Sequence, residues 1–334
     1  MHQLRIAGTG NYLPELTVTN QMLSEIVDTS DEWIMSRTGI SERRLSAGEP
    51  TWHMGAQAAR EALKQAGIQG SEIDLIVVTT ITPDYYTPST ACVIQAEIGA
   101  DRAFCFDINA ACTGFVYALD LAARYLQAGD VQNILIVSSE NISKLVDYSD
   151  RSTCVLFGDG ASAAVCRRSH PDETSRLMST VLGAEGRNAG CLVSRALRLD
   201  HPFLDPDHVW PDRYGHENHH YISMEGQEVF KFAVRVLADS VIEALNKAQV
   251  ELTDVRYIIP HQANIRIVDA AARRMKADPQ QIISRMVDFG NTSSASIPIC
   301  LNELIRSGKL QRGEKVVLCG FGAGLTYGAA VFVY

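Results

Sequence analysis

The sequence of 334 residues predicts an α/β protein built from two similar halves. Short apolar runs bounded by turn residues alternate with longer helical runs, which is the pattern of sheets covered by helices. Residues 73–80 form a largely apolar run, interrupted by Asp74, which is typical of a strand buried on both faces of a parallel sheet. The same order of elements returns after residue 223, so the second half repeats the first.

Capping and turn residues delimit the elements of the first half. Gly67 is placed to end the helix that begins at Thr51, because glycine commonly follows a helix C-terminus. Capping residues at 28–31 precede a short helix that presents Trp33 and, one turn later, Arg37. The predicted helices are 28–34, 51–67, 91–98 and 112–127, and 82–88 is a loop. The predicted strands are 4–10, 73–80, 103–108, 133–138 and 163–166, with a glycine turn between strands at 155–161.

The second half follows a long interruption. Residues 169–220 leave the α/β pattern and are rich in Pro, Asp and His, which favours a surface loop or a loop that caps a pocket. Helices are then predicted at 227–246 and 264–276, and strands at 255–259, 283–287, 315–318 and 329–334. We therefore expect an N-terminal half at 1–170, a capping excursion at 171–222 and a C-terminal half at 223–334.

The repeat pairs positions of the two halves. An offset of 179 positions, taken from Gly129 and Gly308 (308 − 129), carries Cys112 onto Asn291. An offset near 182 overlays strand 73–77 on 255–259, after which His261 follows. Two halves packed about a pseudo-twofold axis would bring both helix starts to the centre. Functional sites commonly lie there, beyond the carboxyl ends of parallel strands.

Composition argues against several classes of function. The chain carries 30 Lys and Arg against 39 Asp and Glu, and the net charge of −9 disfavours general nucleic-acid binding. No segment reaches the ~18 uncharged apolar residues of a membrane span. The 8 cysteines form no C-x-x-C pair, so we expect reduced thiols in a cytoplasmic protein. Residues 8–10 resemble the start of a dinucleotide site but lack its third glycine. No cysteine joins the histidines 216, 219 and 220, so a surface or pocket-capping loop is favoured over a metal site there.

Cys112 is the candidate nucleophile. It stands where the turn at 109–111 meets a helix whose formal charges are Asp120 and Arg124, so the helix is expected to be buried. Unpaired N–H groups and the positive end of the helix dipole favour a thiolate at this position. The alternative is a small buried hydrophobe, which a free cysteine usually is.

Other stretches carry the polar groups that could act with Cys112. His261 follows a strand and Asn291 opens the repeated helix start, so a nucleophile would have two polar partners. The glycine-rich run 320–328 leads into a strand rather than a helix, which disfavours phosphate binding. Its backbone N–H groups could instead approach a reacting carbonyl oxygen. Trp33 and Arg37 could sandwich a base, or Trp33 could fill core with Arg37 on the surface.

Four motifs occur in order: Asn109-Ala110-Ala111-Cys112-Thr113-Gly114, Pro260-His261-Gln262-Ala263-Asn264, Gly290-Asn291-Thr292-Ser293 and the glycine run. Together they resemble the thiolase-like condensing enzymes, and most closely the ketoacyl synthase III family. The resemblance covers nearly the whole chain, including 28–39 and 150–153. It implies a thiolase-like fold, with duplicated βαβαβ halves in five α-β-α-β-α layers. The 196–218 excursion and Ala323, where family members often have glycine, depart from the pattern.

The resemblance implies a ping-pong Claisen condensation that initiates fatty acid synthesis. An acyl group from acyl-CoA would pass to the cysteine, and malonyl-[acyl-carrier protein] would lose CO2 and attack it to give 3-oxoacyl-[acyl-carrier protein]. A homodimer is implied, with no cofactor beyond the CoA thioester and phosphopantetheine-linked substrates. Thr87 stands where acetyl-preferring members carry a bulky aromatic, so the acyl pocket is expected to accept longer or branched groups.

The family also implies a role for individual residues. They are, for catalysis, Cys112, His261 and Asn291; for the oxyanion hole, the N–H groups of Cys112 and Ala323; for CoA, Trp33, Arg37, Arg151 and Asn264; for the acyl pocket, Thr87, Ile142 and Phe157; and for the carrier protein, Lys231, Arg266, Arg273 and Arg274.

Three rival functions stay open at this point. A cysteine hydrolase can use Cys, His and Asn in the same chain order, but the duplicated architecture and the missing papain-like motif argue against it. A non-catalytic partner subunit of this fold would be expected to lack Cys112. A homologue from secondary metabolism could transfer acyl groups to a different acceptor.

Overall fold

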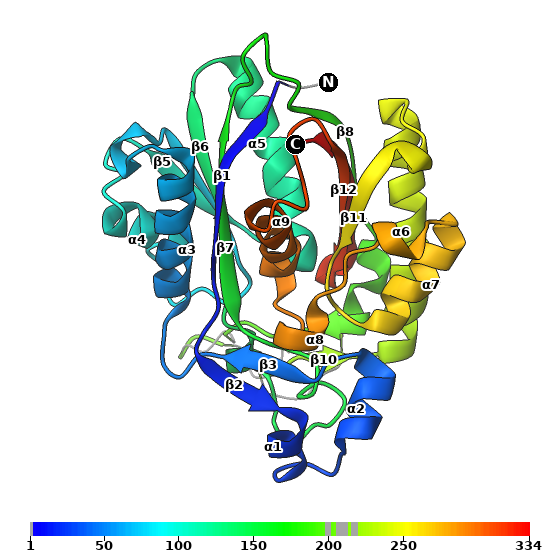
Figure 1. Cartoon of the computed structure of the whole chain (residues 1–334). Helices are drawn as coiled ribbons and strands as arrows, with labels where there is room; N and C mark the ends of the chain where they lie inside the picture. Colours follow the sequence, from blue (N-terminus) through cyan, green and yellow to red (C-terminus); the bar gives the residue numbers. More distant parts are fainter. Residues whose placement is uncertain (1–2, 198–201, 205–212, 215–219) are drawn as a thin grey trace.

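Two mixed β-sheets lie on either side of a pair of central helices (Figure 1). The computed structural model describes residues 3–197, 202–204, 213–214 and 220–334, so His216 and His219 lie outside the described residues. The first sheet, in the order β1-β7-β6-β4-β5, consists of β1 (Arg5–Tyr12), β7 (Gly160–Arg167), β6 (Asn133–Glu140), β4 (Leu75–Thr79) and β5 (Phe104–Ile108). The second, in the order β11-β12-β13-β8, consists of β11 (Val255–Pro260), β12 (Lys315–Gly322), β13 (Thr326–Val333) and β8 (Arg176–Ala184).

Helices cover both faces of each sheet (Figure 1). The central layer contains α5 (Gly114–Ala128) and α9 (Ser296–Arg306). The outer face of the first sheet is covered by α3 (Thr51–Ala66) and α4 (Thr90–Glu97), and that of the second by α6 (Gly226–Ala248) and α7 (Ile265–Met275). The predicted five-layered thiolase-like arrangement is confirmed.

Short elements gather at one end of the molecule, at the bottom of Figure 1. They position the segments that line the site described below. These elements are β2 (Leu16–Thr19), α1 (Asn20–Ser24), α2 (Asp31–Thr38), β3 (Glu42–Leu45), β9 (Leu192–Val193), β10 (Ser223–Met224) and α8 (Met286–Phe289). Arg43 of β3 is buried among them and donates hydrogen bonds to Val18 O (3.0 Å), Asn20 Oδ1 (2.8 Å) and Val155 O (2.9 Å).

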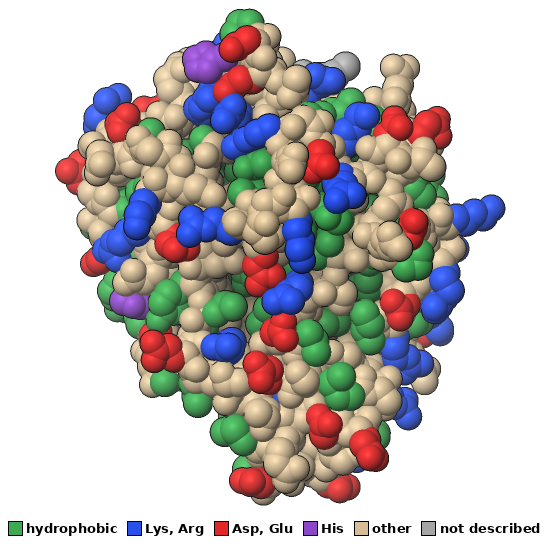
Figure 2. Space-filling model, viewed as in Figure 1, with side chains coloured by type: hydrophobic (Ala, Val, Ile, Leu, Met, Phe, Trp, Pro, Cys, Tyr) green, Lys and Arg blue, Asp and Glu red, His purple; other side chains and the backbone are tan. Residues whose placement is uncertain are grey.

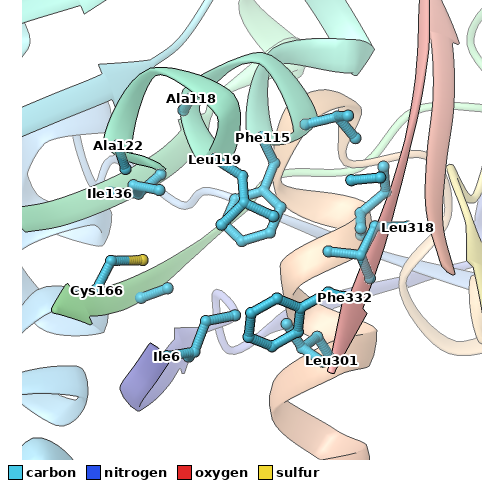
Figure 3. Packing of buried hydrophobic residues seen from close by; sticks show 14 of the residues in the cluster. Ile6, Phe115, Ala118, Leu119, Ala122, Ile136, Cys166, Leu301, Leu318 and Phe332 are labelled. Atoms are coloured by element: carbon cyan, nitrogen blue, oxygen red, sulfur yellow. The ribbon is translucent and has the colours of Figure 1, made fainter. Parts of the chain in front are cut away.

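The central core joins the two halves. Figure 3 shows apolar side chains from both sheets and from the central helices, among them Ile6, Phe115, Leu301 and Phe332. All four are at most 1% exposed. Burial of large apolar side chains is the dominant favourable contribution to folding, so this layer holds the halves together.

The topology of the sheets confirms the repeat and corrects its register. β6 and β12 begin 182 positions apart (315 − 133), and so do the 3₁₀ turns that precede α5 and α9, which begin at Ala111 and Ser293 (293 − 111). Cys112 therefore corresponds to Ser294, and the predicted match to Asn291 is wrong. The error has a structural cause: α9 has 11 residues and α5 has 15, so the glycines that follow these helices are not equivalent.

The predicted strand at 283–287 is also wrong. A single bridge between Ile258 and Ile282 marks the place of a fifth strand, and α8 follows. The side chain of Gln262 satisfies the backbone groups that a strand would pair: its Nε2 donates to Ile283 O (3.2 Å), and its Oε1 accepts from Arg285 N (2.7 Å). A side chain thus replaces a neighbouring strand here.

Three further boundaries differ from expectation. β8 lies inside 171–222, where a capping excursion was expected, and takes in the second sheet the place that β1 takes in the first. Cys112 lies in a 3₁₀ turn, with α5 beginning at Gly114. The segment before the glycine turn forms a single bridge, from Phe157 to Asn291, instead of a strand.

Among the described residues, no helix has the length and apolar character needed to cross a membrane.

We expect the core between the halves to dominate stability. Phe332→Ala should lower the free energy of unfolding by about 3–5 kcal/mol, because it removes a fully buried ring and leaves a cavity. Ile242→Ala, at a site 42% exposed on α6, is the control and should change it by less than about 1 kcal/mol. Urea titration of both variants measures the difference. Equal small effects would mean that the central layer is not a shared core.

Candidate active site

A cavity of about 680 Å³ lies where the two halves meet. Its buried part includes Cys112, His261 and Asn291, which are 9%, 1% and 6% exposed. Its exposed part includes Arg37 and Arg266. The structure therefore brings the three predicted catalytic side chains to one cavity, with cationic groups at its solvent side.

The end of β12 holds the turn that carries Cys112. A Cβ atom on Gly322 would lie 2.6 Å from Cys112 N, so only glycine permits this approach of the two backbones. The hydroxyl of Thr326 donates to Ala110 O at 2.9 Å. Ala111 has a φ of 46°, in the left-handed region that non-glycine residues rarely adopt. The nucleophile is thus fixed by contacts from the opposite half.

Cys112 is a thiol in the resting chain. Burial raises the pKa of its thiol to about 12, the Ser293 hydroxyl and its own backbone N–H oppose that rise, and the charge of Glu140 adds to it. The sulfur donates a hydrogen bond to Ser293 Oγ at 3.4 Å. The predicted preference for thiolate is therefore wrong for this state, because desolvation outweighs the field of the helix N-terminus.

His261 is neutral, and one of its ring nitrogens is bonded to Ser296. Burial lowers the pKa of the imidazole to about 3. Ser296 Oγ accepts from Gln262 N at 3.2 Å and lies 2.7 Å from His261 Nδ1. In the tautomer in which the Ser296 hydroxyl donates to Nδ1, the ring carries its proton on Nε2 and can donate a hydrogen bond through it.

Asn291 presents a second donor. Its Oδ1 accepts from Ser293 N at 2.9 Å, and an oxygen must occupy that position because a backbone N–H can only donate. The Asn291 backbone is fixed by Leu156 O (2.9 Å) and Gly158 N (3.0 Å). No described residue accepts from Nδ2, so this N–H group is available to a ligand beside the Cys112 thiol.

The predicted nucleotide-binding residues also meet. The guanidinium carbons of Arg37 and Arg151 lie 5.8 and 5.0 Å from the centroid of the Trp33 ring. Arg151 also donates to Asp28 O at 2.9 Å. Trp33 is half-buried and lines the cavity, so the alternative of a core Trp with an unrelated surface Arg is not what the structure shows.

Asn264 joins two elements at the cavity. Its Oδ1 accepts from Arg266 N at 2.9 Å and caps the N-terminus of α7, while its Nδ2 donates to Arg37 O at 2.9 Å in α2. The amide therefore uses both ends of its side chain as ties, and α2 and α7 are fixed to each other beside the cavity.

The expected acyl-pocket residues are divided. Ile142 and Phe157 line the cavity, whereas Thr87 is exposed and does not line the cavity of its own chain. Leu192, Val193 and Ile222 also line it, and all three fall in the 171–222 range. That range therefore contributes apolar wall to the cavity.

The four residues expected to bind a carrier protein are exposed on α6 and α7. Figure 2 shows Lys and Arg side chains along the flank formed by these helices. Arg274 forms an ion pair with Asp239 (2.9 Å) and Lys231 with Glu228 (2.7 Å). Lys231 and Arg266 also line the cavity, so the cationic flank reaches its opening.

Ala323 lines the cavity directly after β12, beside the turn of Cys112. It is followed by Gly324, whose φ of 124° lies outside the range that other residues favour. The expected oxyanion donor is therefore next to the nucleophile in the fold, although far from it in sequence.

Sequence reasoning missed Glu140, Ser293 and Ser296, which surround the predicted residues. Ser293 and Ser296 fall in or beside a motif that was recognised, but no spacing rule identifies them. Glu140 ends β6, whose middle residues 134–137 are apolar, and it is fully buried. A carboxyl at the end of such a strand is a detectable signal, because charged residues are rarely buried without partners.

Comparisons with known proteins agree with this geometry. The model of the family described as 3-Oxoacyl-[acyl-carrier-protein (ACP)] synthase III matches residues 106–186, and the model of its C-terminal part matches 245–334. A beta-ketoacyl-[acyl-carrier-protein] synthase III from Clostridium novyi is 45% identical over 98% of each chain. A crystal structure of the corresponding synthase from Aquifex aeolicus is 43% identical, covers 99% of this chain and 100% of that one, and superposes with a TM-score of 0.90.

A more distant relative serves another pathway. The priming β-ketosynthase of the R1128 polyketide biosynthetic pathway is 36% identical, covers 99% of this chain and 96% of that one, and has a TM-score of 0.88.

The fold, the cavity with its cysteine, histidine and asparagine, and full-length relatives at 45% identity all indicate the same family. The chain belongs to the 3-oxoacyl-[acyl-carrier-protein] synthase III family of thiolase-like condensing enzymes.

Proposed function

We propose that the chain catalyses the decarboxylative condensation of an acyl-CoA with malonyl-[acyl-carrier protein], which initiates fatty acid synthesis in the cytoplasm. The observation that carries this proposal is the meeting of one thiol and two neutral N–H donors in one buried cavity. All eight cysteines are free, which suits a reducing compartment.

Acyl transfer to Cys112 is the first step. The sulfur attacks the thioester carbonyl carbon, the C–S bond to CoA breaks, and the CoA thiol leaves. The backbone N–H groups of Cys112 and Ala323 would stabilise the negative oxygen that develops on the carbonyl. Trp33, Arg37 and Arg151 would hold the adenine and phosphate end of CoA by stacking and charge.

Condensation is the second step. His261 Nε2 and Asn291 Nδ2 would donate to the thioester carbonyl of the malonyl group, so that negative charge moves onto that oxygen as CO2 leaves. A neutral imidazole suits this role, because it donates a hydrogen bond without giving up its proton. The resulting enolate carbon attacks the acyl group on Cys112, and the cysteine sulfur leaves.

A role in secondary metabolism is the second candidate, favoured by the likeness to a polyketide priming synthase. Relatives named beta-ketoacyl-[acyl-carrier-protein] synthase III are more similar, at 45% against 36% identity, and match both chains nearly end to end. Primary fatty acid synthesis is therefore the preferred assignment.

We further propose that the enzyme is a homodimer joined through β5. This strand is an edge of the first sheet and pairs only with β4 in the described structure. Large apolar side chains are exposed beside it: Phe104 (47%), Tyr85 (54%) and Tyr86 (75%). Exposed apolar edges are normally covered. Thr87 lies in the same loop as Tyr85 and Tyr86. In such a dimer it would therefore act at the acyl pocket of the partner chain.

The cationic flank of α6 and α7 is proposed to bind the carrier protein. Carrier proteins of this type are acidic, and complementary charge accelerates association. Arg273 and Arg274 lie on α7 outside the cavity, whereas Lys231 and Arg266 line it. Docking here would place the phosphopantetheine arm at the cavity opening.

The two steps should separate by mutation. Cys112→Ser should abolish acylation, whereas His261→Ala and Asn291→Ala should still be acylated but lose about 10²–10³-fold in condensation, the cost of removing one oxyanion donor. Intact-mass measurement after acyl-CoA, then after malonyl-carrier protein, follows each step. Cys92→Ser, which removes an exposed thiol, is the control and should acylate normally. Loss of acylation in Asn291→Ala with condensation intact would reverse the assigned roles.

Charge at the edge strand should break the dimer. Phe104→Glu combined with Tyr86→Glu should give a species near the 36.6 kDa of one chain by light scattering, while the wild type has twice that mass. Ile26→Glu, at a 62% exposed apolar site near α1, should leave the mass unchanged. A wild-type monomer, or a dimer in the double variant, would rule out this interface.

Charge reversal on α7 should affect the carrier step alone. Arg273→Glu with Arg274→Glu should raise the KM for malonyl-carrier protein about tenfold and leave the KM for acyl-CoA within about twofold. The matched control reverses two exposed cations at and just beyond the end of α9, Arg306→Glu with Lys309→Glu, and should change neither KM value. Equal changes in both KM values would show that α7 does not dock the carrier.

A further inference from the structure

Glu140 is a fully buried carboxyl group that the proposed mechanism leaves unused. It ends β6 and is 0% exposed. Its Oε2 accepts from Ile81 N (3.0 Å), Thr82 Oγ1 (3.0 Å) and Thr80 Oγ1 (3.3 Å). Its Oε1 accepts from Ser293 Oγ (3.0 Å) and Ser294 Oγ (2.8 Å). Five donors converge on one carboxyl, which is a polar network built inside the core.

A continuous hydrogen-bonded path connects this carboxyl to the nucleophile. Cys112 Sγ donates to Ser293 Oγ at 3.4 Å, and Ser293 Oγ donates to Glu140 Oε1 at 3.0 Å. The direction of both bonds is the direction in which a proton would leave the sulfur. Ser294 donates to the same oxygen but also to Thr79 O at 3.2 Å, and no bond joins it to Cys112 among the described residues.

The surroundings support a group that can gain and lose a proton. Burial raises the pKa of Glu140, and its hydrogen-bond donors oppose that rise. Among the described residues Glu140 forms no ion pair, and Lys144 in the neighbouring 3₁₀ turn pairs with Asp84 instead. Besides Lys144 and Asp84, the titratable groups on the elements packed around β6 include Cys112, His53 of α3, Cys166 of β7, and Asp159, which precedes the Gly160 that pairs with Glu140. Asp159 accepts from Ser143 rather than from the path between Cys112 and Glu140. A carboxyl held by hydrogen bonds alone is the acceptor that a buried thiol requires.

From this geometry we propose that Glu140 is the proton acceptor for Cys112, acting through the hydroxyl of Ser293 during the acylation step. The inference rests on the proposed function, since it concerns the first half of that reaction. Glu140 touches no substrate in this role. It acts on Cys112 only through Ser293, and its effect is to leave the sulfur negatively charged.

The step balances as follows. The Cys112 S–H bond breaks and its proton passes to Ser293 Oγ, while the Ser293 hydroxyl proton passes to Glu140 Oε1. Cys112 is then a thiolate, Ser293 is unchanged, and Glu140 is a neutral acid. The thiolate attacks the acyl-CoA carbonyl, and the C–S bond to CoA breaks. The leaving CoA thiolate takes the hydroxyl proton of Ser293, which lines the cavity, and Glu140 returns its proton to Ser293 Oγ, so that the carboxylate is restored. No oxidant or reductant takes part.

The test measures the reactivity of Cys112 with two probes. Iodoacetamide reports on thiolate without needing any substrate, and an acyl-CoA reports on the reaction itself, both followed by intact mass between pH 6 and 9. Ser293→Ala and Glu140→Gln should slow both modifications at pH 7 by about 30-fold or more. Their rates should then rise about tenfold per pH unit, as for an unassisted buried thiol, while the wild-type rate changes much less.

Matched variants separate a proton path from support of the fold. Ser294→Ala removes the same kind of donor from Glu140 without touching the path, so its effect should be at least tenfold smaller than that of Ser293→Ala. Glu140→Asp should recover part of the reactivity that Glu140→Gln loses. Protein acylated by prolonged incubation should condense with malonyl-carrier protein within about threefold of the wild-type rate, because the path acts before that step.

Specific outcomes would overturn the proposal. Equal losses in Ser294→Ala and Ser293→Ala, an unaltered pH profile in Ser293→Ala, or equal slowing of acylation and condensation would each reduce Glu140 to structural support. Should Glu140→Gln not fold, Ser293→Ala carries the same test. A wild-type chain that reacts with iodoacetamide but with no acyl-CoA would contradict the proposed function. In that case the iodoacetamide rates of the wild type and the variants would still show whether the proton path exists.

Discussion

The site depends on a reciprocal contact in which each central strand supports the helix start of the other half. Gly322, at the end of β12, lies against the turn that carries Cys112, and Glu140, at the end of β6, accepts hydrogen bonds from Ser293 and Ser294. The two strand ends are 182 positions apart (322 − 140), as the two turns are. Each turn takes part of its support from the opposite half, so the site is complete only when the halves pack.

Burial acts in the same sense on the three buried ionisable groups at the centre of the site. It raises the pKa of Cys112 and of Glu140 and lowers the pKa of His261, so each neutral form is favoured. The reaction nevertheless requires negative charge, first on sulfur and then on two carbonyl oxygens. Neutral donors fixed beforehand meet that need, since they stabilise charge when it develops and repel nothing when it is absent.

Sequence reasoning could predict the layers, the nucleophile and its two polar partners, because strand patterns and four motifs lie in single short stretches. It failed where a side chain, and not a neighbouring strand, forms the hydrogen bonds to the backbone. Gln262 replaces a strand beside Ile283, and no pattern in residues 283–287 reveals that. The prediction of a Cys112 thiolate failed for a similar reason. Desolvation of the thiol is a property of the assembled halves, whereas the helix start alone predicts a lowered pKa.

The amide of Asn264 ties α2 to α7 through Arg37 O, beside the opening of the cavity. One helix carries the ring that would stack on a nucleotide, and the other carries the cations that would meet a carrier protein. A displacement of either helix is therefore passed to the other. If CoA binds at one of these helices and a carrier protein at the other, as proposed, any coupling that Asn264 transmits acts equally in both directions, because thermodynamic reciprocity requires each ligand to change the affinity of the other by the same factor.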